Sequence, residues 1–183
     1  MSEFMEAPEV PIEQTQEDIH HHAHQSKEKW TMGVALSSAL LAALAAVSSL
    51  MAGHHSNEAM IDQIRSSDQW SHYQAKSIKA NVLGAKLEML KAVGKPSNEK
   101  DQEKLTEYKN EQEDIKRQAE EKEQASERHL HSHVIFARAV TMFQVAIAVA
   151  AISVLTQRRR FWFISLAFGL VGAAFLLQGF FAH

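Results

Sequence analysis

The 183-residue chain contains no cysteine. This absence excludes disulfides, thiolate zinc sites and a cysteine nucleophile. Proline is scarce as well, since its three copies stand at positions 8, 11 and 96. Long helices are therefore allowed over most of the chain, because proline is the residue that breaks a helix interior. The formal net charge is −3, so no basic excess indicates nucleic acid as a partner.

Catalytic signatures are also missing from the sequence. There is no phosphate-binding glycine loop and no G-x-S-x-G stretch around a nucleophilic serine. The apolar runs contain no acidic residue, which argues against a proton-coupled transporter with a carboxylate inside the membrane. We therefore expect no enzymatic activity and no organic cofactor.

Three long apolar runs are present, at residues 31–53, 134–156 and 161–182. Each has the roughly 20 residues that a helix needs to cross about 30 Å of hydrocarbon. Their one ionisable residue is Arg138, which can extend its guanidinium to the lipid headgroups or serve as a functional charge, paired with Glu58. A chain this short has no soluble core to bury three such runs. The sequence predicts an all-α membrane protein with three transmembrane helices in contact with lipid.

The orientation follows from Arg158, Arg159 and Arg160, which fill the short turn predicted at residues 157–160. Clustered arginine in a short loop stays on the cytoplasmic side. The polar segment 1–30 is then cytoplasmic, and the C-terminus lies on the other side. Trp30 and Trp162 stand at span edges, as interfacial anchors do.

Residues 54–133 are expected to form an extramembrane helical hairpin. The composition favours helix on both sides of a turn near 94–98, where Gly94 suits a helix C-cap and Pro96 stops the helix. The predicted fold is thus a three-span, all-α membrane protein with a long antiparallel hairpin between spans one and two. By the arginine rule, this hairpin lies outside the cytoplasm.

Self-association is predicted from two patterns. One arm of the hairpin has a heptad-like seam, which consists of Ile61, Ile64, Asp68, Ser71, Ala75, Ile78, Val82, Ala85 and Met89. The other arm has too few apolar residues to cover both this seam and the further apolar side chains Trp70, Tyr73, Leu83, Leu87 and Leu90. Span one adds small residues that favour close helix contact, namely Gly33, Ser37, Ala42, Ala46, Ser49 and Gly53. A second copy of the chain is the expected partner, and the sequence indicates no soluble one.

Histidines stand at the outer ends of spans one and two. If the hairpin turns near residue 95, one group lies at the same depth, and it consists of His54, His55, His129 and His133. Neutral imidazoles could bind Zn²⁺, Cu²⁺ or Ni²⁺ there, or titrate as a pH sensor. The simpler interpretation is that histidine suits the membrane–water interface. A second cluster, expected to be a solvated approach to span one, consists of His20, His21, His22 and His24.

Three stretches resemble a family of small bacterial membrane proteins classed as domain of unknown function 4337. They are SEFMEAPEVP, KEKWTMGVALSSALLAALAAVSSLMAGHHSNEAM and ERHLHSHVIFARAVTMFQVAIAVAAISVLTQRRRFW. The resemblance implies a multi-pass protein of the bacterial inner membrane, with the hairpin and the C-terminus in the periplasm. It supplies no catalytic residues.

Two functions fit these patterns. The first is a homo-oligomeric structural or interaction protein that presents a bundle of hairpins outside the membrane. The alternative is a channel or transport accessory whose axis is lined by span one, with a histidine-rich mouth that responds to metal or pH. Its polar lining would consist of Ser37, Ser38, Ser48 and Ser49.

Overall fold

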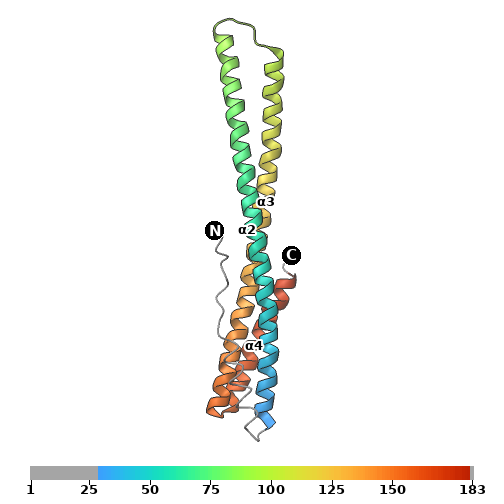
Figure 1. Ribbon diagram of the computed structural model, residues 1–183, viewed down its shortest axis with the longest axis vertical. Coiled ribbons are helices and arrows are strands. Elements are labelled where there is room, and N and C mark those ends of the chain that lie inside the picture. Colours follow the sequence, from blue (N-terminus) through green and yellow to red (C-terminus); the bar gives the residue numbers. More distant parts are fainter. Residues whose placement is uncertain (1–28, 182–183) are drawn as a thin grey trace, which may run out of the picture. The chain divides into compact units, whose positions relative to one another are not determined.

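The computed structural model describes residues 29–181, and these residues are entirely helical apart from two turns. The helices are α2 (Lys29–Ala92), α3 (Glu99–Thr156) and α4 (Arg159–Phe181) (Figure 1). Each contains a stretch long and apolar enough to cross a membrane. The polar segment predicted at residues 1–30 lies outside the described residues, except for its last two.

The turn between α2 and α3 falls where Gly94 and Pro96 predict it. Gly94 has a φ of 68°, a left-handed conformation that glycine adopts without steric cost. The backbone N–H of Lys95 donates to the carbonyl of Leu90 at 2.9 Å and so satisfies an end carbonyl of α2. The side chain of Asn98 accepts from the N–H of Lys100 at 3.2 Å, which caps the start of α3.

The turn between α3 and α4 is shorter than the sequence predicts. It consists of Gln157 and Arg158, and Arg159 and Arg160 already belong to α4. Gln157 has a φ of 51°, and this left-handed residue reverses the chain at once. The N–H of Arg158 donates to the carbonyl of Ser153 at 3.2 Å. The prediction of a four-residue basic turn is therefore corrected to two residues.

The chain divides into two compact units. The three-helix unit contains the described residues 29–55 and 131–181, and the hairpin unit contains residues 56–130. Helices α2 and α3 contribute residues to both units, whereas α4 belongs to the three-helix unit alone.

The three-helix unit is held together by small residues of α4 packed against large residues of the other two helices. The buried face of α4 consists of Ser165, Gly169, Gly172, Leu176 and Gly179. A Cβ at Gly172 would lie 2.9 Å from the ring of Phe143, and one at Gly179 would lie 2.6 Å from the ring of Phe136. Phe136 is 1% exposed and Phe143 is 0% exposed. Their rings therefore pack directly against the backbone of α4. These five residues of α4 recur at alternating steps of four and three. Their contact with the other two helices was not predicted from the sequence.

In the hairpin unit, α2 and α3 run side by side in opposite directions (Figure 1). Ser66 Oγ donates to the carbonyl of Ala119 at 3.1 Å. Ser126 Oγ donates to the carbonyl of Ala59 at 2.8 Å. Small side chains that bond to the opposite backbone let the two helices approach closely. Nearer the turn, ion pairs join Lys76 to Glu111 and Lys86 to Asp101.

Candidate interaction surface

The predicted seam of α2 is exposed along its whole length. All nine seam positions between Ile61 and Met89 are exposed, and Ile78 and Val82 keep 63% and 66% of their surface in solvent. The side chains of α2 that are buried in the hairpin unit lie on another face, at Ala59, Asp62, Ser66 and Ala80. Helix α3 therefore covers one face of α2 and leaves the seam free.

The apolar side chains off the seam are half-buried. They are Trp70, Tyr73, Leu83, Leu87 and Leu90. The sequence pattern separates these residues from the seam, but it did not predict that they are half-buried while the seam is exposed. Leu83, Leu87 and Leu90 follow Ala80 at successive steps of three, four and three residues, and this spacing is the signal that identifies the second face.

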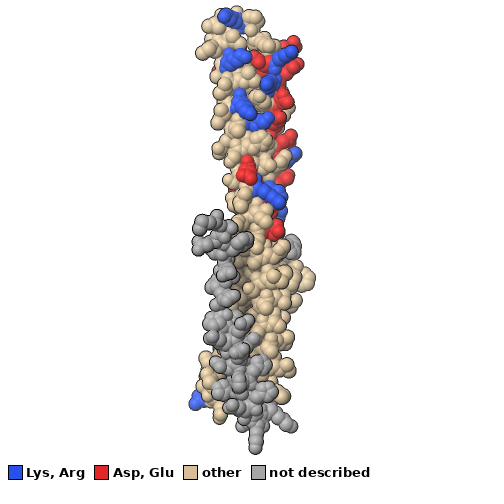
Figure 2. All heavy atoms as spheres, in the orientation of Figure 1, with Lys and Arg blue, Asp and Glu red and all other residues tan. Residues whose placement is uncertain are grey.

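Charge is distributed unequally between the two arms. Residues 56–92 of α2 contain nine Asp, Glu, Lys and Arg residues, whereas residues 99–130 of α3 contain eighteen. In Figure 2 most of the acidic side chains gather along α3. The α3 arm is thus built to face water on its outer side, and the apolar surface of the hairpin unit is concentrated on α2.

The small residues predicted as the oligomer contact of span one fall into two groups. Gly33 faces the ring of Trp162, and a Cβ there would lie 3.4 Å from it. Ser37 accepts from Trp162 Nε1 at 3.1 Å, and Ala42 packs against the buried core of the three-helix unit. These three residues thus have contacts inside the chain, and their part in a contact between copies stays a prediction. The members left exposed are Ala46, Ser49 and Gly53.

The predicted histidines have separate surroundings. His55 is buried and stacks on Phe136, with ring centroids 5.5 Å apart and planes 9° from parallel. His54 is exposed, with its ring centroid 5.5 Å from that of His55. His133 Nδ1 lies 2.9 Å from the carbonyl of Ala52. A carbonyl only accepts hydrogen bonds, so this contact requires the proton on Nδ1.

His129 belongs to the hairpin unit and lies beside an acidic residue. Its Nε2 is 4.0 Å from Asp62 Oδ2. Within residues 29–181, no three histidine or carboxylate side chains are grouped so that they could hold a metal ion. Binding of Zn²⁺, Cu²⁺ or Ni²⁺ by the four histidines therefore stays a prediction that this geometry does not support.

Asp62 is the most enclosed carboxylate of the hairpin unit, with its side chain 8% exposed. Lys122 Nζ of α3 lies 3.3 Å from Asp62 Oδ1, and Arg65 lies 3.6 Å from the same oxygen. The periodicity of α2 did not single out this residue. Two cations compensate its buried charge, and one of them, Lys122, belongs to the opposite arm, which indicates a structural ion pair that fixes the two arms against each other.

The predicted topology residues lie at helix ends. Trp30 is buried at the start of α2, with the guanidinium of Arg159 5.6 Å from the centre of its ring. Trp162, in the first turn of α4, is half-buried. Arg138 is exposed on α3 and forms no ion pair within the described part of the chain. Its role at a lipid or protein boundary stays a prediction.

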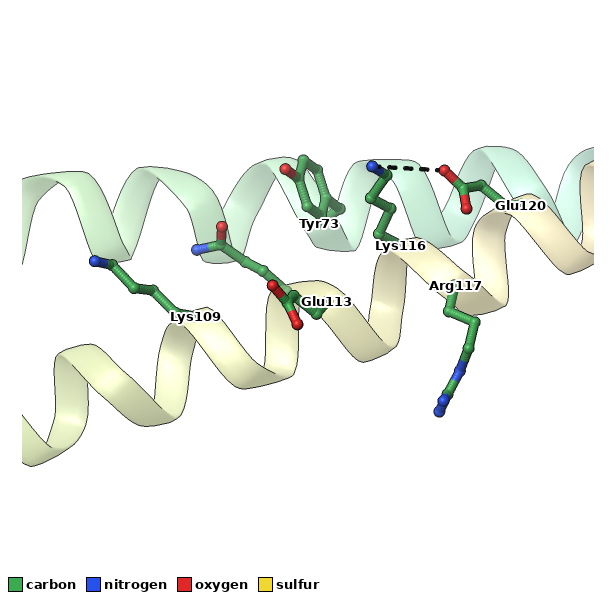
Figure 3. Close-up of a pocket in the computed structure, with 7 residues that line it drawn as sticks. Tyr73, Lys109, Glu113, Lys116, Arg117 and Glu120 are labelled. Carbon is green, nitrogen blue, oxygen red and sulfur yellow. Dashed lines mark ion pairs between the residues drawn. The ribbon is translucent and has the colours of Figure 1, made fainter.

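A hollow of about 460 Å³ lies in the hairpin unit. It is lined by Tyr73, Lys109, Gln112, Glu113, Lys116, Arg117 and Glu120. Figure 3 shows Lys116 paired with Glu120 and Arg117 directed away from the hollow; the pair measures 3.6 Å. Gln112 Nε2 is buried and has no hydrogen-bond partner among the described residues. The lining mixes both signs of charge, so it indicates no particular class of ligand.

Over residues 29–181 these features define an all-helical fold with three helices apolar enough to cross a membrane and an exposed apolar seam on one of them. The chain belongs to the family described as a domain of unknown function (DUF4337), whose model matches residues 30–182. No curated protein and no solved structure matches the chain.

Proposed function

We propose that this chain is a homo-oligomeric structural protein of a membrane, which holds a bundle of helical hairpins in the water beside it. One observation carries the membrane placement. In the most apolar 18-residue window of α2, α3 and α4, 33%, 39% and 28% of the residues are buried inside the chain. Most of each apolar window therefore needs cover from lipid or from another chain.

The proposed compartment is the bacterial inner membrane, with the N-terminus in the cytoplasm. The hairpin and the C-terminus are then periplasmic. Support comes from Arg158, Arg159 and Arg160, which are exposed together at the junction of α3 and α4. Three cations in so short a connection favour the cytoplasmic side.

The structural role is supported by what the hairpin unit offers to a partner. Its exposed apolar surface forms a long strip on α2 rather than a concave site. Such a strip suits association between helices, which buries a continuous seam without requiring a cavity. The hairpin would then hold the assembly together and keep its α3 arms turned towards water.

The channel alternative lacks a lining. Ser38 and Ser48 are buried inside the chain, and each donates to a carbonyl of its own helix at 2.8 Å. Ser37 is half-buried and accepts from Trp162. Among the four candidate serines only Ser49 is exposed on α2, and this burial of the other three favours the structural role.

Cysteine labelling tests the placement, because the parent chain has no cysteine. Lys95→Cys puts a thiol in the α2–α3 turn, and Gln157→Cys puts one in the α3–α4 turn at a position that already tolerates a side chain with positive φ. We expect a membrane-impermeant maleimide to label K95C on intact spheroplasts and to label Q157C only after permeabilisation. The reverse pattern would overturn the orientation. Release of the chain from membranes by alkaline carbonate would overturn the membrane placement itself.

A further inference from the structure

The exposed seam of α2 has a strict seven-residue repeat. One set of seam positions consists of Ile61, Asp68, Ala75, Val82 and Met89, and the second set consists of Ile64, Ser71, Ile78 and Ala85. All nine are exposed. Apolar positions that alternate at three and four residues bring one helix face to a partner helix in a left-handed coiled coil. We call this set the α2 seam.

The two flanks of the α2 seam differ in charge. The flank that follows the second set is basic, and consists of Arg65, His72, Lys79 and Lys86. The flank that precedes the first set is polar, and consists of Ser67, Gln74, Asn81 and Glu88. All eight residues are exposed. Arg65 and Lys86 have acidic partners within the chain, at Asp62 and Asp101.

We propose that the α2 seam binds the α2 seam of a second copy of this chain, with the two helices parallel and identical residues facing each other. The proposal deepens the function proposed above and rests on it. Helix α3 is not the partner, because it packs on the face of α2 that contains Ala59, Ser66 and Ala80.

Membrane insertion is the first reason for a parallel arrangement. Copies that cross the membrane in the same direction present their α2 helices in the same direction and at the same height. Equal-numbered residues of neighbouring copies then lie at equal distances from the membrane. In-register contact therefore requires no displacement of one copy along the other.

The flank charges are the second reason. In an antiparallel pair the basic flanks of the two copies would face each other. Each copy's flank, which consists of Arg65, His72, Lys79 and Lys86, would then lie along the same flank of the second copy. Like charges in such flanking positions disfavour a pairing. In a parallel pair the basic flank faces the polar flank, where Gln74 and Asn81 can accept hydrogen bonds from lysine.

The exposed small residues of span one do not continue the seven-residue repeat of the α2 seam. They are Gly53, Ser49 and Ala46, and they precede Asn57 at steps of four, four and three residues. A Cβ at Gly53 would meet nothing within 4 Å in its own chain. Small residues at such spacing let helices approach closely in lipid. The exposed members of the predicted stripe in span one therefore form a patch separate from the α2 seam that is available for contact with a second copy.

Asp68 is the one charged residue of the α2 seam. In a parallel pair Asp68 faces the same residue of the second copy, and two facing carboxylates weaken the association. The apolar positions of the α2 seam on either side of Asp68 must therefore supply the stability of the pairing.

Single cysteines test the pairing directly. The variants Ile64→Cys, Ala75→Cys and Val82→Cys sample the α2 seam, and Asn81→Cys is the matched control, exposed next to Val82 but on a flank. A disulfide requires Cα atoms closer than about 7 Å, so we expect oxidation in native membranes to cross-link V82C at least about tenfold more than N81C. We expect the same of I64C and A75C, because only a parallel pair brings all three positions together.

The outcomes separate the pairing from the membrane placement, which carbonate extraction checks in the same samples. Membrane-embedded chains that cross-link at no seam position would overturn the pairing and leave the membrane placement intact. Cross-linking at one seam position alone would indicate an antiparallel crossing and contradict the parallel register. A product whose mass is not a multiple of the chain would assign the α2 seam to a different protein, and would also overturn the proposal.

Discussion

At the residue scale, the hairpin depends on a buried carboxylate and the cations around it. The Asp62 side chain is 8% exposed, and its Oδ1 lies 3.3 Å from Lys122 Nζ. We expect Lys122→Met to lower the free energy of unfolding by about 1–2 kcal/mol, because it leaves a buried charge with fewer partners. Circular dichroism of thermal unfolding in detergent measures this effect. The control is Lys116→Met, which breaks a half-exposed pair with Glu120 and should change stability by less than about 0.5 kcal/mol.

Equal losses in K122M and K116M would contradict a special role for Asp62. The comparison is direct because both lysines stand on the same arm of α3 and lose the same charge. They differ in the exposure of their acidic partners, which is 8% for Asp62 and 49% for Glu120.

Glycine also acts at the residue scale, where α4 meets α3. A Cβ at Gly172 would lie 2.9 Å from two ring carbons of Phe143, and this ring is fully buried. We expect Gly172→Ala to destabilise the three-helix unit by about 1–3 kcal/mol, because the ring has no free volume into which to move. Gly84→Ala is the control, since a Cβ there meets nothing within 4 Å.

Alanine has the higher helix propensity, so G84A should be neutral or more stable by about 0.5–1 kcal/mol. Both variants can be compared by the temperature at which the detergent-solubilised chain unfolds. If G172A proved as stable as G84A, the close contact between α4 and Phe143 would be wrong.

At the element scale, the pairing of the two arms should respond to alkaline pH. Hydrogen bonding to Glu111 raises the pKa of Lys76, and the negative charge of Glu111 adds to the effect. A raised lysine pKa contributes stability that is fully present below the ordinary value of 10.5 and is lost as the pH rises through the folded-state pKa. We expect Lys76→Met to remove part of the fall in melting temperature above pH 10.5. An unchanged fall in K76M would show that this ion pair is not formed.

The α2 seam permits a sharp test by substitution. Ile78 is 63% exposed and belongs to the seam, whereas Asn81 is an exposed residue of the polar flank. We expect Ile78→Glu to dissociate the assembly while the helix content stays unchanged, because the charge is placed in the contact between copies and not inside the chain. Asn81→Glu should stay assembled. Multi-angle light scattering in mild detergent compares the two, and an assembled I78E would contradict the contact.

Local signals predicted these elements well. Gly94 predicted the end of α2. The scarcity of proline allowed a helix as long as α2 but did not set its length. The predicted length of the turn after Thr156 was wrong by two residues. Glycine would mark a left-handed position in the sequence, but no comparable signal marks Gln157. The inward face of span one was not predictable either. Every face of that run is apolar or small, so periodicity could not show that Gly33 and Ser37 contact Trp162.

The histidines show a similar limit. Their depth along the hairpin follows from the position of the turn, but the directions of their rings depend on how each helix is rotated about its axis. The stacking of His55 on Phe136 and the bond from His133 to Ala52 are results of that rotation. A sequence without a metal-binding spacing motif contains no signal for this rotation of the helices.

At the scale of the whole molecule, the chain itself leaves most of the apolar window of each of its three described helices uncovered. Lipid would cover the outer faces of α3 and α4, and a second copy would cover the α2 seam. This division explains why the α2 arm has half the charged residues of the α3 arm. It also assigns the exposed small residues of α2 to a contact between copies and the small residues of α4 to the inside of the chain.

Native mass spectrometry of the untagged protein, released from membranes in mild detergent, tests the central claim most directly. The account predicts one discrete multimer of the 20.5 kDa chain, free of other proteins, and its loss in I78E but not in N81E. A clean monomer of the parent chain, or a complex of fixed composition with a different protein, would contradict the account.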